Sequence, residues 1–192
     1  MTRQLVLIRH ASSVPEPSLS QRDWGLSEKG KGRCVHLAEQ LRPYRLQQIF
    51  ASSEVKARQT AEHTAAELQI PWTTREGFEE QGGRDAPWIE EFQEFLDRVK
   101  RLLMFPTELI HGSETGVQTG ERFSAAVQGL LQDVPEGNLG IVTHGRVLTL
   151  FLAQHTAIDP VSFWRSLAMP CFILLMYDGD TLLTKIPEIQ YI

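Results

Sequence analysis

The chain has 192 residues, of which 42% are hydrophobic and 22% are charged, and its formal net charge is -5. This length and composition predict a globular protein with a core of normal size. The negative charge argues against a protein that binds nucleic acid or an anionic membrane surface in bulk. It is still compatible with a local basic pocket for a small anionic substrate.

The two cysteines, Cys34 and Cys171, lie far apart, and neither belongs to a metal-binding motif such as C-x-x-C. We expect both to be reduced, buried thiols, which are typical of a cytosolic protein. No stretch approaches the ~20 apolar residues that span a bilayer, and the apolar run at 6–8 is too short for a signal peptide. The sequence therefore predicts a soluble, cytoplasmic protein.

Strands and helices alternate along most of the chain. Apolar runs predict the strands, whereas helical spacing of apolar residues and caps such as Ser27 predict the helices. This alternation predicts a three-layer α/β/α domain with a mostly parallel central sheet. In chain order, the predicted elements are a strand at 4–8, a helix from 28 that ends before Pro43, a strand at 46–51, a helix at 54–68, a short strand at 72–74, helices at 88–105 and 121–131, a strand at 139–143, a helix from 147 to about 154, a short helix from 160, and a hairpin of strands at 171–177 and 182–186.

No linker divides the chain, so residues 1–192 are predicted to form a single domain. Within it, about residues 76–120 are expected to be an insertion that caps the sheet. We interpret Trp88 and Trp164 as core residues rather than as a platform for a substrate. The helix at 88–105 is expected to bury Ile89, Phe92, Leu96, Val99 and Leu103.

Two glycines, Gly30 and Gly32, lie early in the first predicted helix. Each disfavours that helix by about 1 kcal/mol relative to alanine. We therefore expect that another part of the backbone approaches the helix closely here.

Two predicted strands end in a similar pattern of residues. The strand at 4–8 runs into Arg9 and His10, and the strand at 139–143 runs into His144 and then Arg146. Parallel strands end at the same edge of an α/β sheet, which is where such sheets bind ligands. We therefore expect His10 and His144 to converge in one site.

A third strand end contributes positive charge. The segment 52–60 follows the strand at 46–51 and enters a helix, whose N-terminus attracts anions. Its cations, Lys56 and Arg58, are two residues apart, so they do not share a helix face. We expect at most one of them to point into the site.

Two histidines, several cations and an acid in one site favour phosphoryl transfer through a phosphohistidine. A neutral imidazole attacks phosphorus, while arginines and a second, protonated histidine neutralise the phosphoryl oxygens. An acid protonates the leaving oxygen and then, as a carboxylate, activates water. We expect no metal and no cofactor, because the scheme needs neither and the sequence has no carboxylate-rich metal motif.

These segments resemble the histidine phosphatase superfamily, which includes the cofactor-dependent phosphoglycerate mutases. The resemblance implies a phosphoglycerate mutase-like fold, with His10 as the phosphorylated nucleophile, Arg9 as a ligand of the phosphoryl group and His144 as the second catalytic histidine. The matching pieces are Leu7–His10, Leu26–Gly30, Ala51–Ser52 through Gln59–Glu62, and Val142–Gly145.

The chain departs from the family pattern just after His10 and in the second cation. The family has a glycine after this histidine and then a threonine and an asparagine, whereas this chain continues with 11–13, Ala-Ser-Ser. The family's second arginine lies four residues before the threonine that is Thr60 here, and that position is Lys56. We take Lys56 as the phosphate-binding residue, although lysine lacks the bidentate fork of arginine, and keep Arg58 as the alternative.

The catalytic acid is sought in the irregular stretch after the short strand at 72–74, where the family places a glutamate. Glu79 and Glu80 are both available there. An apolar residue two positions before the acid is the usual pattern, and Phe78 therefore selects Glu80. Glu79 is the alternative.

The resemblance predicts a phosphomonoesterase of the histidine acid phosphatase type that acts on a small phosphorylated substrate. The alternatives are a phosphoglycerate mutase-like phosphotransferase and a phosphate-binding module without activity. A phosphatase is favoured because the chain is short and its loops are not visibly basic enough for a bisphosphate. We expect no nucleic-acid or membrane partner, and the strand at 171–177 could supply an edge for a homodimer.

Overall fold

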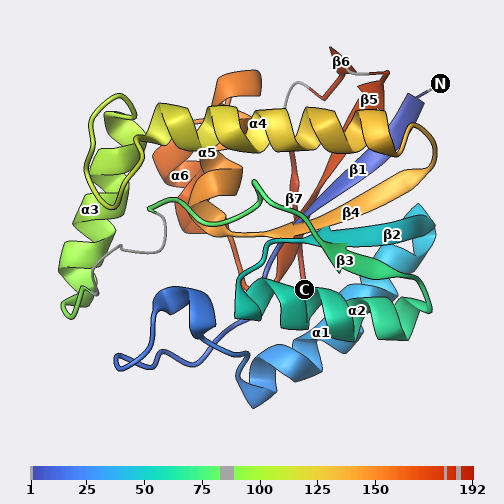
Figure 1. Ribbon diagram of the computed structural model, residues 1–192, viewed down its shortest axis with the longest axis horizontal. Coiled ribbons are helices and arrows are strands. Elements are labelled where there is room, and N and C mark those ends of the chain that lie inside the picture. Colours follow the sequence, from blue (N-terminus) through green and yellow to red (C-terminus); the bar gives the residue numbers. More distant parts are fainter. Residues whose placement is uncertain (1, 83–88, 180, 185–186) are drawn as a thin grey trace.

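The computed structural model describes residues 2–82, 89–179, 181–184 and 187–192. A mixed sheet lies at its centre, with helices on both faces (Figure 1). The strand order is β3-β2-β4-β1-β5-β6, and β7 also pairs with β5. The strands are β1 (Thr2–Arg9), β2 (Leu46–Ala51), β3 (Trp72–Thr74), β4 (Asn138–Thr143), β5 (Cys171–Asp178), β6 (Thr181–Leu182) and β7 (Ile189–Tyr191).

The four strands β3, β2, β4 and β1 run parallel, and β5 is antiparallel to β1. The prediction of a mostly parallel sheet is therefore confirmed. Arg9 at the end of β1 is in register with Thr143 at the end of β4. The residues that follow these two, His10 and His144, consequently leave the sheet side by side, and the His10 N–H donates to the Thr143 carbonyl over 3.0 Å.

The helices form two layers around the sheet, which confirms the three-layer prediction. Figure 1 shows α1 and α2 on one face, and α4 and α5 on the other. Side chains alternate along β1, so that Val6 and Ile8 pack toward α1 and α2, whereas Leu5 and Leu7 pack toward α4 and α5. The helices are α1 (Glu28–Leu41), α2 (Val55–Leu68), α3 (Phe92–Met104), α4 (Gly116–Asp133), α5 (Gly145–His155) and α6 (Pro160–Ser166), with short 3₁₀ helices η1 (Gln21–Asp23) and η2 (Arg42–Tyr44).

Helix α4 begins five residues before the predicted start at 121. Thr115 caps it by accepting a hydrogen bond from the Gln118 N–H, and the Gln118 side chain accepts one from the Thr115 N–H. This capping box satisfies two backbone donors at the helix start and extends the helix into a segment that is rich in polar residues and glycine.

Helix α3 buries part of the predicted face. Val99 and Leu103 are buried as predicted and pack with Leu102 on Leu150 of α5, and Ile89, just before the helix, is also buried, whereas Phe92 is 71% exposed. The prediction for Phe92 is therefore wrong, because α3 contacts its neighbours with its C-terminal half. Residue 88, the predicted helix start and one of the two tryptophans interpreted as core, lies outside the described residues.

The two glycines of α1 differ in their surroundings. A Cβ on Gly30 would lie 2.2 Å from the Ser12 carbonyl oxygen, whereas a Cβ on Gly32 would meet nothing within 4 Å. The same Ser12 carbonyl accepts a hydrogen bond from the Ser27 N–H. The expected close approach is thus confirmed at Gly30 and is wrong at Gly32.

Strand β5 has both edges paired. One edge pairs with β1, and β6 and β7 cover the other. The strand at 171–177 is therefore not an edge strand along its whole length; β7, which the sequence analysis did not predict, fills part of that edge. The homodimer stays a prediction. Cys34 and Cys171 are both free and buried, and burial raises the pKa of each thiol to about 11. Among the described residues, no helix has the length and apolar character needed to cross a membrane.

Candidate active site

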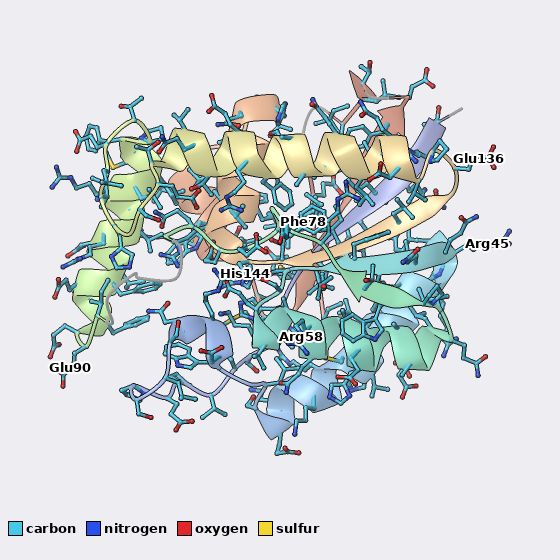
Figure 2. The ribbon with its side chains drawn as sticks, in the orientation of Figure 1. Arg45, Arg58, Phe78, Glu90, Glu136 and His144 are labelled. Carbon is cyan, nitrogen blue, oxygen red and sulfur yellow. The ribbon has the colours of Figure 1, made fainter. Side chains whose placement is uncertain are left out.

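A pocket of about 270 Å³ opens at the carboxyl ends of β1, β4 and β2. Four of the five residues proposed from the sequence line it, namely Arg9, His10, Lys56 and Glu80. The fifth, His144, lies behind His10 and is fully buried. Figure 2 shows His144 at the end of β4, next to the start of α2.

The His10 ring is neutral and has a defined tautomer. Its Nδ1 lies 2.8 Å from the Ala11 carbonyl oxygen, which can only accept, so the N–H is on Nδ1. Burial, reinforced by the positive charges nearby, holds the pKa of His10 well below 6.5. Nε2 therefore keeps its lone pair, which is the state that a nucleophile needs.

His144 packs edge-on against His10, with 5.1 Å between the ring centroids. Its Nε2 lies 2.8 Å from the Ser52 hydroxyl and 3.7 Å from a carboxylate oxygen of Glu54. Burial lowers the pKa of His144, and the Glu54 carboxylate opposes this shift. Its Nδ1 is buried without a hydrogen-bond partner in the described part of the chain.

Arg9 is held at the pocket by the segment between α6 and β5. Its Nη1 donates to the Leu167 carbonyl over 2.6 Å. Its Nε is buried and has no hydrogen-bond partner among the described residues. A Cβ on Gly145 would lie 3.2 Å from the guanidinium carbon, so the glycine after His144 leaves room for this side chain.

Lys56, rather than Arg58, lines the pocket. Its Nζ donates to the Gln21 carbonyl over 2.7 Å and lies 2.6 Å from a carboxylate oxygen of Glu54. An ammonium has three N–H donors, so one donor remains for an anion. Arg58 is exposed on α2 and lines a separate pocket beside β3.

Glu80 accepts hydrogen bonds at the N-terminus of α5. Its Oε1 lies 2.9 Å from the N–H groups of Gln81 and Val147, and its Oε2 lies 3.2 Å from the Arg146 N–H. Burial disfavours the carboxylate, but Arg146, His144 and the backbone donors outweigh it and lower the pKa to about 2. Glu80 is therefore ionised at neutral pH when the pocket is empty.

Glu79 does not line this pocket. Its carboxylate accepts hydrogen bonds from the Ser53 hydroxyl at 3.0 Å and the Gly77 N–H at 2.8 Å, and it lies 3.8 Å from Arg122. Of the two candidate acids, the structure brings Glu80 and not Glu79 to His10.

The sequence analysis missed Glu54, which was interpreted only as the start of a helix. Its side chain is 3% exposed and contacts three of the proposed site residues. It pairs with Lys56, approaches His144, and accepts the Glu80 N–H over 2.9 Å. Burial raises its pKa, but His144 and Lys56 outweigh burial and lower the pKa to about 2. The sequence did contain a signal for Glu54, which lies two residues before Lys56 and shortly after the end of strand β2.

Among the other residues that line the pocket, Arg22, Arg146 and Trp164 were not assigned to it from the sequence. Arg22 of η1 donates to the Ser53 hydroxyl over 3.1 Å. Arg146, which the sequence analysis noted only as a neighbour of His144, lies 3.3 Å from the Gln81 side-chain oxygen. Trp164 is half-buried and faces the pocket, so its interpretation as a core residue is only partly right.

The pocket combines the groups that phosphoryl transfer requires. His10 offers a neutral ring nitrogen, and His144 lies beside it. Arg9 and Lys56 supply positive charge that stabilises phosphoryl oxygens, and Glu80 supplies a carboxylate that can exchange protons. The arrangement can therefore attack, hold and release a phosphoryl group.

The sequence model of the histidine phosphatase superfamily (branch 1) matches residues 5–184. No curated protein matches the sequence significantly.

Solved structures with the same fold include two phosphatases and a mutase. A mycobacterial glucosyl-3-phosphoglycerate phosphatase is 20% identical with a TM-score of 0.70, and the match covers 98% of this chain and 97% of that chain. A phosphoglycerate mutase from Bacillus anthracis is 15% identical with a TM-score of 0.73, covering 96% of this chain and 92% of that chain. A mutant phosphoserine phosphatase from Entamoeba histolytica, in complex with phosphoserine, is 16% identical with a TM-score of 0.69, covering 95% of each chain.

Proposed function

The chain belongs to the histidine phosphatase superfamily, and from this membership we propose that it hydrolyses small phosphomonoesters through a phosphohistidine on His10. The observation that carries the proposal is the state of the His10 ring. Its Nδ1–H is committed to the Ala11 carbonyl, so the neutral ring keeps a lone pair on Nε2. A neutral imidazole in a pocket with several cations is suited to attack an anionic ester.

In the first half of the reaction, Nε2 of His10 forms a bond to phosphorus while the bond from phosphorus to the ester oxygen breaks. Arg9 and Lys56 neutralise charge on the phosphoryl oxygens. The negative charge of the bound ester raises the pKa of His144, so that this imidazole takes up a proton and adds a further positive charge.

Glu80 moves the protons in both halves. The dianion of the ester raises the pKa of Glu80, which can then carry the proton that the leaving oxygen takes. The resulting carboxylate removes a proton from water, whose oxygen attacks phosphorus as the N–P bond breaks. As inorganic phosphate leaves, His10 is restored, and Glu80 releases the proton to solvent and returns to the carboxylate of the free enzyme.

We further propose that the chain acts as one catalytic domain in which about residues 76–120 cap the pocket. Phe95 of α3 and Gln81 both line the pocket. The cap is tied to the sheet layer because α3 packs on Leu150 of α5.

The test is turnover of p-nitrophenyl phosphate, together with detection of the phosphoenzyme by mass spectrometry at alkaline pH. His10→Ala should abolish both signals. His36→Ala is the matched control, since this exposed histidine of α1 lies outside the pocket, and it should leave both unchanged. Turnover that survives in His10→Ala would exclude the proposed nucleophile.

The same assay separates the alternatives. Binding of inorganic phosphate without turnover of any phosphoester would support a binding module. Activity that depends on a bisphosphate primer and returns the phosphoryl group to an acceptor would support a mutase.

A further inference from the structure

The pocket has two chemically different parts, which we call the floor and the wall. Arg9, His10, Lys56 and Glu80 form the charged floor, and Trp164 and Phe95 form the aromatic wall. Trp164 of α6 lies close to Arg9, because both side chains approach Gly145. A Cβ on Gly145 would lie 3.3 Å from the Trp164 indole Nε1 and 3.2 Å from the Arg9 guanidinium. Phe95 of α3 continues the wall outward, with its ring centroid 6.2 Å from that of Trp164. Both side chains are half-buried and line the pocket.

The loop between β1 and α1 adds two apolar residues to the lining, Trp24 and Pro15, beside the polar residues Ser13, Ser20, Gln21 and Arg22. The Trp24 indole N–H donates to the Glu16 carbonyl over 2.9 Å. Met169 adds a further apolar side chain to the lining. A group bound above the phosphate-binding residues can therefore contact aromatic side chains.

Of the two arginines that line the pocket beside the phosphate-binding residues, Arg146 pairs with Glu80 and lies 3.3 Å from the Gln81 side-chain oxygen. Its guanidinium carbon is 6.0 Å from the centroid of the Phe95 ring. Arg22 donates one hydrogen bond to Ser53 and keeps its other donors. A flat apolar group on the substrate would bury its surface against the rings of Trp164 and Phe95.

Building on the proposed function, we propose that the preferred substrates are monophosphates of flat, apolar alcohols, with the alcohol packed against the Trp164–Phe95 pair. The pocket volume of about 270 Å³ fits one phosphoryl group and a small ring system. It lies just below the usual range of roughly 300–1,000 Å³ for pockets that bind drug-sized ligands. Aliphatic polyols and carboxylated esters are disfavoured substrates.

The experiment compares kcat/KM for benzyl phosphate, ethyl phosphate and 3-phosphoglycerate, which are all esters of aliphatic alcohols. We expect benzyl phosphate to exceed each of the others by roughly tenfold or more, as expected for a well-packed aromatic contact. Equal values for benzyl and ethyl phosphate, or a preference for 3-phosphoglycerate, would overturn the inference.

Variants of the aromatic residues show whether the wall causes the preference for benzyl phosphate. Phe95→Ala should lower kcat/KM for benzyl phosphate by about tenfold and that for ethyl phosphate by less than about twofold. Phe92→Ala is the matched control, because Phe92 stacks on Phe95 with 6.4 Å between centroids but is exposed outside the pocket. It should change neither value, and a Phe95→Ala variant that loses both substrates equally would refute the role of the wall. Trp164→Phe keeps an aromatic ring and should retain most of the preference.

Inhibition by phosphonates separates this inference from the proposed function, because phosphonates bind without being hydrolysed. Benzylphosphonate should bind at least about tenfold more tightly than methylphosphonate, and Phe95→Ala should remove the difference. If no phosphoester is hydrolysed but this difference is found, the proposed function fails and the ligand class stands. If turnover occurs and the two phosphonates bind equally, the ligand class fails and the phosphatase stands.

Discussion

Glu54→Gln tests the buried ion pair beneath the active site. The substitution keeps the shape of the side chain and an oxygen that can accept the Glu80 N–H, but it removes the negative charge that lies 2.6 Å from Lys56 Nζ. Both partners are almost fully buried, with side chains 3% and 8% exposed, so the ammonium of Lys56 is left without a counterion in a poorly solvated place.

Loss of one partner of a buried ion pair costs about 3–5 kcal/mol of unfolding free energy. Because the glutamine oxygen can still accept the Glu80 N–H, we expect a loss of unfolding free energy near the lower end of this range, at about 3 kcal/mol. For a chain of this length, that corresponds to a decrease in Tm of roughly 6–12 °C. Urea unfolding at neutral pH, followed by circular dichroism, measures the change directly.

Two further variants show whether the buried charge is responsible. Glu54→Gln combined with Lys56→Met removes both charges and should be more stable than Glu54→Gln alone. Glu28→Gln removes an exposed glutamate that also pairs with a lysine, at 2.7 Å from Lys31, and should leave the urea midpoint unchanged. A Glu54→Gln protein with the wild-type midpoint would refute this account of the pair.

Three other outcomes are expected. The pKa of Glu80 is lowered from 4.5 to about 2, so ionisation of Glu80 stabilises the fold fully above about pH 4.5, and this stabilisation is lost as the pH falls toward 2. Glu80→Gln should therefore make the urea midpoint less dependent on pH between these two values. An unchanged dependence would contradict the shift. Lys56→Ala should lower kcat/KM by roughly tenfold or more, whereas Arg58→Ala should leave kcat/KM within about twofold of wild type. The reverse result would show that Arg58, and not Lys56, binds the phosphate. Gly30→Ala should destabilise the protein by about 1–3 kcal/mol in thermal melts, because its Cβ would lie 2.2 Å from a backbone carbonyl oxygen. Gly32→Ala, whose Cβ would meet nothing, should stabilise it by up to about 1 kcal/mol, and equal effects of the two substitutions would show that the close approach is unimportant.

Strands β1 and β4 could be predicted because most of their residues are buried on both faces, and such strands are apolar runs. The predicted bounds of β2 and β3 also match those of the structure, although β3 is a largely exposed edge strand. The start of α4 was missed, although Thr115 and Gln118 have the spacing of a capping box. Gly116 argues against a helix, yet its Cβ would lie 3.0 Å from Pro106 and Leu150, so packing against distant residues requires the glycine.

The candidate site was predictable where it depends on topology. His10 and His144 each follow a strand, and parallel pairing of β1 with β4 is enough to bring them together. Glu54 depends instead on contacts between elements that the sequence does not place, since its charge is balanced by Lys56 and His144 only in the folded chain. The same is true of Trp164, whose position at the pocket follows from the docking of α6 on α5 and α3.

The place of β1 in the sheet has a consequence for how the protein is made. This strand is synthesised before both of its sheet neighbours, β4 and β5, which lie more than a hundred residues further along the chain. A nascent chain on the ribosome therefore carries an apolar strand with two open edges until β4 and β5 emerge, which exposes it to aggregation. His10 likewise emerges long before His144 and before the Leu167 carbonyl that holds Arg9. The pocket can therefore form only after the chain has been synthesised beyond Leu167.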